Sequence, residues 1–411
     1  MNPTLERIKN AIIQANIPDI IEAVIRLALE RNASDIHIEP GKNVVRIRLR
    51  IDGVLRIIVE YPLNLHPGVV SKVKILANLK IDESRIPQDG RINTYIDETE
   101  VDLRTSTLPT ATGEKVVMRV LDKSKRVPSI EQLGIEGRNL ERFTAALREP
   151  NGILLTSGPT GSGKTTTMYS AMSYLNTPEK NLMTFEDPIE NQMPGLNQSQ
   201  VRPDIDYTFA RGLRTALRQD PDIIMVGEIR DRETIDIAIE ASLTGHLVLS
   251  TIHTNSAVET ITRILNMKVP DFLLCSSVRL IIAQRLARKL CNTCKVPTPM
   301  SQDMLHKMQT AFEDFNPWED FDMRLLNTPM VHSAAKEGCG NCEGTGYSGR
   351  VAIFEVLDMT EEIKKAILEG QPGYEIQKRA IAEGMVTLEQ DGLIKVLQGI
   401  TSIEEIYKLV Q

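Results

Sequence analysis

The sequence has few aromatic residues and no excess of basic side chains. Its 411 residues include only 8 Phe, 8 Tyr and 1 Trp, which argues against a protein that binds nucleic acid by base stacking. The 48 Lys and Arg are outnumbered by 55 Asp and Glu, and the net charge of −7 excludes a globally basic nucleic-acid binder. We therefore expect no nucleic-acid partner.

Long apolar runs are absent as well. No stretch reaches the roughly 18 apolar residues of a transmembrane helix, and the N-terminal residues 1–19 contain too many polar side chains for a signal-peptide core. We expect a cytoplasmic chain that associates with a membrane only through partners.

The N-terminal part, residues 1–121, combines one helical pattern with several alternating ones. Residues 17–31 place apolar side chains at helical spacing, and the runs that follow alternate apolar with polar residues at period two. This pattern predicts an α+β domain with a largely antiparallel sheet. The polar stretch 122–132, which contains Pro128, is predicted to be an interdomain linker.

The pattern changes in residues 133–290, where continuous apolar runs are separated by helical stretches. Runs that are apolar on both faces are typical of buried parallel strands, so this segment is predicted to form a doubly wound α/β sheet. Cysteines bound residues 291–349, and residues 350–411 are predicted to form C-terminal helices that end near glycines.

A phosphate-binding motif lies in the α/β segment. The sequence GPTGSGKTTT follows an apolar run, precedes a helical one and matches G-x-x-x-x-G-K-[ST]. Its backbone N–H groups converge on phosphate oxygens, its lysine reaches the β and γ phosphates, and Thr165 supplies a hydroxyl to Mg²⁺. The alternative is a glycine-rich turn without a ligand. The predicted ATP-binding residues are Gly158, Pro159, Thr160, Gly161, Ser162, Gly163, Lys164, Thr165 and Thr166.

Three further polar residues stand at ends of apolar runs. Glu228 follows DIIMVG, and we predict that it orients and deprotonates the attacking water; the alternative is a carboxylate that caps a helix. Glu186, in TFEDPIE, belongs to an acidic patch that can act on Mg²⁺ through water. His253 ends TGHLVLSTIH and is predicted to contact the γ-phosphate, with a structural histidine as the alternative.

Four of the five cysteines form two CxxC pairs, Cys291 with Cys294 and Cys339 with Cys342. In a cytoplasmic chain this pattern indicates four thiolate ligands of a structural Zn²⁺ rather than disulfides. Free or redox-active thiols are the alternative. The long stretch between the pairs requires that two distant turns be brought together.

Two alternating runs near the N-terminus carry charge on one face. Asp35, His37 and Glu39 share one face of the first run, and Arg46, Arg48 and Arg50 share one face of the next. The arginines can attract a phosphate polymer, but the net charge favours a polar interface.

Four segments resemble, in order and in sequence, the conserved boxes of the secretion ATPase family. The Walker A, Asp, Walker B and His boxes correspond to GPTGSGKTTT, TFEDPIE, RQDPDIIMVGEIRD and TGHLVLSTIHTN. Members of this family drive type II secretion (GspE) and type IV pilus extension (PilB). The resemblance extends to the CxxC pairs and covers nearly the whole chain. The usual Walker B aspartate is Gly227 here, so this strand is not expected to ligate the metal directly.

The resemblance implies a fold, an assembly and further site residues. A PAS-like N-terminal domain precedes a RecA-like motor domain, and six copies form a ring that hydrolyses ATP with Mg²⁺. Catalytic arginines are implied at Arg91, Arg104, Arg214 and Arg218.

The favoured function is type IV pilus extension through an inner-membrane platform protein, which recruits the ring to the inner face of the cytoplasmic membrane. The alternatives are a type II secretion motor, a RecA-like motor that translocates nucleic acid, and a nucleotide-gated scaffold that does not turn over ATP.

Overall fold

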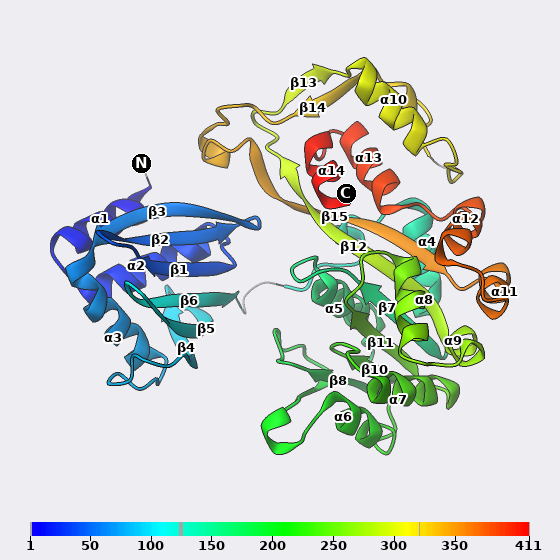
Figure 1. The fold of residues 1–411 in the computed structure, drawn as a ribbon, viewed down its shortest axis with the longest axis horizontal. Helices are drawn as coiled ribbons and strands as arrows, with labels where there is room; N and C mark the ends of the chain where they lie inside the picture. The colour runs from blue at the N-terminus through cyan, green and yellow to red at the C-terminus, as the bar shows by residue number, and fades with distance from the viewer. Residues whose placement is uncertain (1, 123–125, 320, 411) are drawn as a thin grey trace. The chain divides into compact units, whose positions relative to one another are not determined.

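The chain forms two compact units, Met1–Arg126 and Val127–Gln411, in a computed structural model that describes residues 2–122, 126–319 and 321–410 (Figure 1). The division falls within the predicted linker 122–132, of which residues 123–125 lie outside the described residues. The linker as a whole stays a prediction.

The N-terminal unit is a six-stranded sheet with helices packed on one face. The strand order is β3-β2-β1-β6-β5-β4, and every neighbouring pair is antiparallel. Its elements are α1 (Pro3–Ile13), α2 (Ile17–Glu30), β1 (Asp35–Pro40), β2 (Val44–Ile51), β3 (Val54–Pro62), α3 (His66–Leu76), β4 (Gln88–Ile96), β5 (Thr99–Thr110) and β6 (Gly113–Asp122). The predicted α+β fold with an antiparallel sheet is confirmed.

The alternating sequence explains which face the helices cover. Ile36 and Ile38 of β1 and Val69 of α3 are fully or almost fully buried in one core with the apolar side of α2. Asp35, His37 and Glu39 occupy the other face of β1, since side chains alternate along a strand. Asn16 begins α2 by accepting a hydrogen bond from the Asp19 N–H at 3.4 Å.

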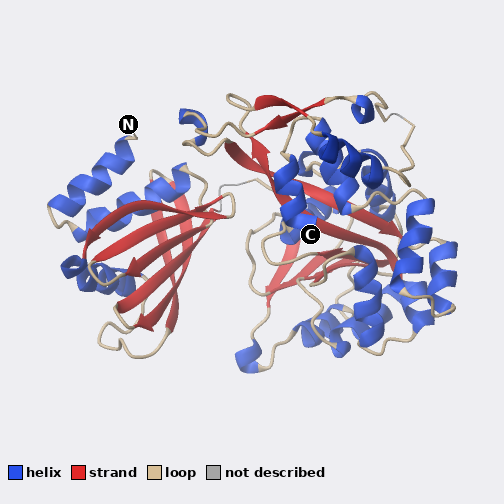
Figure 2. Cartoon of the chain, turned by 45° about the horizontal axis from the view of Figure 1, so that its top comes forward, coloured by secondary structure: helices blue, strands red, loops and turns tan. Residues whose placement is uncertain are grey.

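The second unit is built on a seven-stranded sheet with helices on both faces (Figure 2). The strand order is β15-β12-β7-β11-β10-β8-β9, and all neighbours are parallel except β15 beside β12. The elements up to the cysteines are α4 (Gly137–Leu147), β7 (Gly152–Ser157), α5 (Lys164–Leu175), β8 (Leu182–Glu186), β9 (Leu196–Gln200), α6 (Phe209–Ala216), β10 (Ile223–Val226), α7 (Arg232–Leu243), β11 (Leu247–Ile252), α8 (Ala257–Asn266), α9 (Asp271–Ser277) and β12 (Val278–Leu290).

The central strands are buried on both sides, as their continuous apolar runs predict. In β7, Ile153 and Leu155 belong to the core on one face of the sheet, whereas Leu154 belongs to the core on the other face. The doubly wound α/β fold is therefore confirmed.

The cysteine-bounded segment and the C-terminal region complete this unit. Their elements are β13 (Val296–Pro299), α10 (Gln302–Ala311), β14 (Met330–Ser333), β15 (Tyr347–Asp358), α11 (Glu361–Leu368), α12 (Gly373–Ala382), α13 (Leu388–Leu397) and α14 (Ile403–Val410). The prediction of helices from residue 350 is wrong as far as Asp358, because β15 pairs with β12 as the edge strand of the main sheet. In the described parts of the chain, every helix is too short or too polar to cross a membrane.

Candidate functional site

The predicted phosphate-binding loop connects β7 to α5. Three of its glycines, Gly158, Gly161 and Gly163, have φ angles of +149°, +80° and +91°. A Cβ on Gly158 would lie 2.4 Å from Ser162 Oγ, and one on Gly163 would lie 2.7 Å from Gln284 Nε2. Only glycine fits these two positions, so the sequence fixes an open loop at the N-terminus of α5.

Lys164 is the first residue of α5, and its side chain turns back over this loop. Its Nζ donates hydrogen bonds to the carbonyls of Gly158 at 2.7 Å and Pro159 at 3.1 Å. Burial lowers the pKa of Lys164, and the nearby Glu228 carboxylate opposes that shift. The Oγ of Ser162 is buried without a protein partner. A buried ammonium and an unpaired hydroxyl on one loop fit a phosphate group.

The loop, Glu228 and His253 lie at the carboxyl end of the parallel strands, since β11 pairs in parallel with both β7 and β10. His253 Nε2 lies 3.4 Å from Glu228 Oε2. Arg230 forms an ion pair with the same carboxylate, which raises the pKa of Arg230. The strand end itself is fixed, because Thr251 Oγ1 donates a hydrogen bond to the Gly227 carbonyl at 2.7 Å. The structure thus brings together Glu228, which is predicted to act on the attacking water, and His253, which is predicted to contact the γ-phosphate.

Glu186 has a different environment at the end of β8. Its side chain is 3% exposed, and its carboxylate accepts hydrogen bonds from the hydroxyls of Tyr169 and Thr184 and from Gln198 Nε2. The Tyr169 hydroxyl also accepts hydrogen bonds from the N–H groups of residues 190 and 191. Glu186 therefore anchors α5 to the loop after β8, and its catalytic role stays a prediction.

Two of the four predicted arginines lie in the second unit and two lie in the N-terminal unit. In α6 and just after it, Arg214 binds Glu233 at 3.0 Å, and Arg218 donates a hydrogen bond to the Arg214 carbonyl at 3.0 Å. In the N-terminal unit, Arg91 of β4 and Arg104 of β5 stand directly opposite each other.

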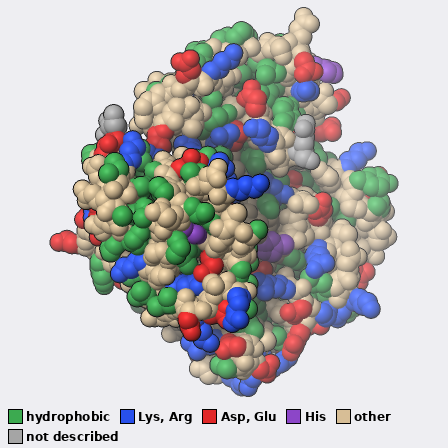
Figure 3. Space-filling model, turned by 60° about the vertical axis from the view of Figure 1, so that its left-hand side comes forward, with side chains coloured by type: hydrophobic (Ala, Val, Ile, Leu, Met, Phe, Trp, Pro, Cys, Tyr) green, Lys and Arg blue, Asp and Glu red, His purple; other side chains and the backbone are tan. Residues whose placement is uncertain are grey.

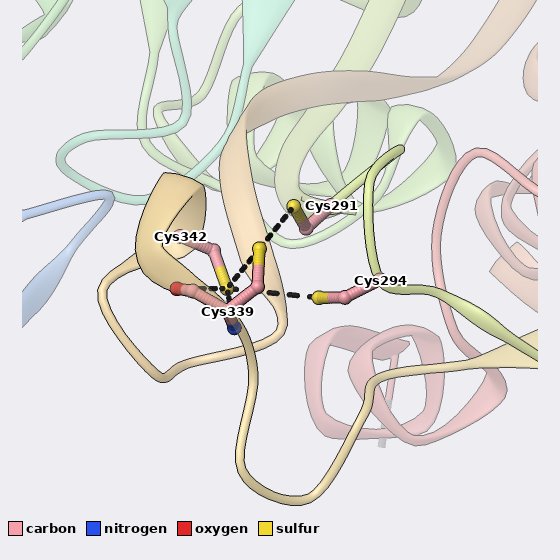
Figure 4. A group of neighbouring side chains, drawn as sticks. All are labelled: Cys291, Cys294, Cys339 and Cys342. Atoms are coloured by element: carbon pink, nitrogen blue, oxygen red, sulfur yellow. Dashed lines mark hydrogen bonds between the residues drawn. The ribbon is translucent and has the colours of Figure 1, made fainter.

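The four cysteines of the CxxC pairs form one cluster, and their sulfur atoms point toward one another (Figure 4). Cys291 Sγ lies 3.8 Å from Cys339 Sγ, and Cys294 Sγ lies 3.7 Å from Cys342 Sγ. All four sulfurs lie within 4.8 Å of one another. Four sulfurs around Zn²⁺ at about 2.3 Å would be separated by about 3.8 Å, the edge of the tetrahedron. The cluster therefore has the size of a tetrahedral zinc site.

The surroundings of the cluster favour the thiolate of Cys342 and oppose that of Cys294. Burial raises the pKa of Cys342, but N–H groups of Cys339 and Gly346 donate to its sulfur and lower that pKa to about 6. Burial and the neighbouring sulfurs raise the pKa of Cys294 to about 12. A divalent cation removes this conflict, because it stabilises all four thiolates together.

Strand pairing explains how the distant cysteine pairs meet. Cys291 directly follows β12, Cys342 precedes β15, and these antiparallel strands pair as far as Leu290 opposite Tyr347. Each cysteine pair is thus carried to the same end of the sheet.

Comparison with known proteins decides the family. A model of the family described as "Type II/IV secretion system protein" matches residues 11–408. The chain belongs to this family.

Secretion-family relatives named for two different systems are similar to the chain. The type IV pilus assembly ATPase PilB of Thermus thermophilus is 47% identical over 386 residues, covering 94% of this chain and 42% of the relative. The type II secretion system protein E of Pseudomonas aeruginosa is 43% identical over 409 residues, covering 100% and 78%. The chain therefore spans less than half of the first relative and about four fifths of the second.

Solved structures share the fold. The ATPase DotB of Legionella pneumophila superposes with a TM-score of 0.69 at 22% identity, over 96% of this chain and 95% of that one. The pilus retraction motor PilT with bound ADP gives 0.62 at 25% identity, over 95% and 96%.

The sequence did not predict a set of buried polar residues that hold the elements around the site by hydrogen bonds. Gln284 Oε1 accepts a hydrogen bond from Thr167 of α5 at 2.7 Å, and Arg285 donates to the Asn255 carbonyl at 2.7 Å. Glu355 accepts from the first N–H of α8. The available signal was a polar residue that interrupts an apolar run, as Gln284 and Glu355 do in IIAQRLA and AIFEVL.

Proposed function

We propose that this chain is an ATPase that drives type IV pilus extension as a homo-hexamer bound to an inner-membrane platform protein. The observation that carries the proposal is the position of the buried Lys164 and its loop. They lie at the same carboxyl end of the parallel strands as the Glu228–His253 pair. The similarity to PilB along 94% of the chain supports the pilus system.

The predicted site residues have two kinds of role, which are binding of the ATP phosphates and activation of the attacking water. ATP supplies the transferable phosphoryl group, and Mg²⁺ neutralises charge on its phosphates. Lys164 and the loop N–H groups would bind the phosphates, and the Thr165 hydroxyl would hold the ion. Glu228 takes the proton of the attacking water, while Arg230 and His253 hold that carboxylate in place.

The cysteine cluster is proposed to hold one structural Zn²⁺ through Cys291, Cys294, Cys339 and Cys342. Four thiolates fill a tetrahedral shell and leave no position for water, so this ion would stabilise the segment and take no part in hydrolysis.

Type II secretion is the second candidate system. The specific observation in its favour is the similarity to the type II secretion system protein E of Pseudomonas aeruginosa, which is 43% identical over 100% of this chain. Co-purification with a pilus platform protein or with a secretion platform protein distinguishes the two systems.

Nucleic-acid translocation is less favoured. On the face drawn in Figure 3, Lys and Arg side chains stand among Asp and Glu side chains. ATP turnover that nucleic acid does not stimulate would argue against a translocase, and ATP binding without turnover would indicate a scaffold.

The first test compares two single changes. Lys164→Ala should abolish or nearly abolish ATP binding, because it removes the buried ammonium from the phosphate loop. Glu228→Gln should keep ATP bound and stop hydrolysis, since it spares that loop. Equilibrium ATP binding and steady-state turnover measure both effects. Wild-type turnover in the Glu228→Gln protein would remove this residue from catalysis.

A further inference from the structure

Two consecutive polar residues of β12, Gln284 and Arg285, lie beside the phosphate-binding loop. The register places Ala283 opposite Ser157, the last residue of β7, so the two residues continue beside the start of the loop. Gln284 is only 1% exposed and Arg285 only 8%. Because side chains alternate along a strand, these two reach opposite faces of the sheet.

Gln284 contacts the phosphate-binding loop and the helix that follows it. Its Oε1 accepts a hydrogen bond at 2.7 Å from the hydroxyl of Thr167, in the first turn of α5. Its carbonyl oxygen would lie 2.6 Å from a Cβ on Gly158, and its Nε2 would lie 2.7 Å from a Cβ on Gly163. Gln284 therefore supports both ends of the loop together with the start of α5.

Arg285 contacts the turn that follows β11. Its Nη2 donates a hydrogen bond to the Asn255 carbonyl at 2.7 Å, and its Nη1 donates one to the Gln284 carbonyl at 3.0 Å. Asn255 comes two residues after His253, which faces the Glu228 carboxylate. One planar guanidinium thus connects the main chain beside the phosphate loop to the main chain beside the Glu228–His253 pair.

The surroundings of Arg285 keep this contact in place. Burial lowers the pKa of Arg285, and the carboxylates of Glu355 and Glu259 oppose that shift. A buried guanidinium that loses an acceptor is costly, so the Asn255 carbonyl is strongly favoured as its partner. The Asn255 N–H donates to Glu259 Oε2 at 2.8 Å, so the turn is held at both main-chain groups of one residue.

We propose that Gln284 and Arg285 are positioning residues for ATP hydrolysis with separate tasks. Gln284 holds the loop and the helix that bind the phosphates, whereas Arg285 holds the turn that carries His253 to Glu228. The inference rests on the proposed roles of Lys164, Glu228 and His253. Strand β12 then fixes the part of the site that binds ATP against the part that activates water.

Arg279, near the other end of β12, is a matched control. Its Nε donates to the Asn151 carbonyl at 3.4 Å, and its Nη2 donates to Asn151 Oδ1 at 3.2 Å. It therefore also binds the main chain of an asparagine, but this asparagine precedes β7, at the amino end of the parallel strands. Arg285→Met and Arg279→Met both remove a guanidinium and keep an unbranched side chain.

The first experiment measures turnover and the Kd of a non-hydrolysable ATP analogue with Mg²⁺ in the full chain. Arg285→Met should lower kcat about 10- to 100-fold and change Kd less than about threefold, because the phosphate loop keeps its support. Gln284→Met should instead raise Kd about 10-fold. Arg279→Met should leave both quantities near those of the wild type. The same balance of effects on kcat and Kd in the Arg285 and Gln284 variants would overturn the proposal.

Arg285→Lys separates positioning from charge. The positive charge of Arg285 adds to burial in lowering the pKa of Lys164, so its field reaches the phosphate loop. Lysine keeps that charge but lacks the planar fork that binds two carbonyls. The kcat of this variant should therefore stay about fivefold or more below that of the wild type. A wild-type kcat would show that the charge alone is needed.

Thr260→Val loosens the same turn and serves if Arg285→Met does not fold. The Thr260 hydroxyl lies 2.7 Å from the Thr254 hydroxyl, and valine keeps its shape without this hydrogen bond. We expect a lower kcat at an unchanged Kd. A wild-type kcat in the folded variant would contradict the dependence of hydrolysis on this turn.

Hydrogen exchange in the nucleotide-free full chain tests the contact without hydrolysis. Arg285→Met should speed exchange of the Asn255 N–H about 10-fold, whereas Arg279→Met should not change it. Unchanged exchange would overturn the inference even in a chain that hydrolyses ATP. Faster exchange would support the contact even if Glu228→Gln kept wild-type turnover, so a failure of the inference is distinguishable from a failure of the proposed function.

Discussion

Two glutamates at the ends of the neighbouring strands β8 and β10 have opposite surroundings. Glu228 is partly exposed and faces His253, whereas the carboxylate of Glu186 is buried beneath three hydrogen-bond donors. The same residue type is therefore proposed to act in hydrolysis at one strand end, whereas at the next it accepts hydrogen bonds inside the fold. Burial and bonding partners, which a sequence motif does not show, make the difference.

Glu186→Gln should destabilise the second unit by about 1–3 kcal/mol, because one carboxylate oxygen becomes an amide nitrogen that cannot accept hydrogen bonds. Either the Tyr169 hydroxyl or the Thr184 and Gln198 donors then lose their acceptor. Urea denaturation measures this loss. The exposed Glu190 provides the control, and Glu190→Gln should stay within about 0.5 kcal/mol of the wild type. Lost turnover at unchanged stability would instead support the predicted catalytic role of Glu186.

At the scale of elements, one buried carboxylate joins two helices. Glu355 of β15 accepts hydrogen bonds from the Ala257 N–H at 2.8 Å and from the Leu388 N–H at 3.4 Å. These are the first residues of α8 and α13. Burial raises the pKa of Glu355, and the two N–H groups oppose that shift. The starts of α8 and α13 are thus anchored to the same strand.

Glu355→Gln should weaken both helix starts together, because its amide nitrogen leaves one of the two N–H groups without an acceptor. We expect a stability loss of about 1–3 kcal/mol and faster hydrogen exchange in the first turns of both α8 and α13. Glu361→Gln, at the exposed start of α11, is the matched control. Faster exchange in only one of the two helices would contradict the shared anchor.

The strands also show how much of the fold can be predicted from the sequence. Alternation in β1 and the continuous apolar run of β7 were sufficient to predict both sheets, since these signals are local. The strand β15 was missed, although its apolar run after Gly349 resembles that of β7. Its pairing with β12 depends on residues far away in the chain. The pairing of Arg104 with Arg91 on one side and with Arg119 on the other was hidden for the same reason, because sequence predicts the faces of a strand but not its neighbours.

At the scale of the whole molecule, the proposed zinc ion stabilises a segment far from the phosphate loop in sequence. We expect about one zinc per chain by elemental analysis, and binding of such an ion can contribute roughly 10–16 kcal/mol. A chelator should lower the melting temperature of the wild type but not that of the Cys339→Ser variant. ATP binding should survive in that variant.

The only tryptophan gives this test a local readout. Trp318 lies between the two cysteine pairs and packs against Phe315 and Phe321, with ring centroids 6.2 Å and 4.8 Å apart. Chelation should therefore shift its fluorescence emission in the wild type, and Cys275→Ser, which changes a cysteine outside the cluster, should leave that shift intact. A folded protein without metal and with four alkylated thiols would contradict the zinc site.

The direct pairing of Leu290 with Tyr347 also bears on how such a chain tolerates change in length. The cysteine-bounded segment is inserted between two strands that pair as a hairpin, and its residues Met308 and Val331 pack into the same core as β7. Doubling the length of a flexible loop adds only about 0.6 kcal/mol of closure entropy. A change in the length of this segment therefore adds little closure entropy, and a shorter turn at the same place would keep the order of the strands while it loses the packing of Met308 and Val331.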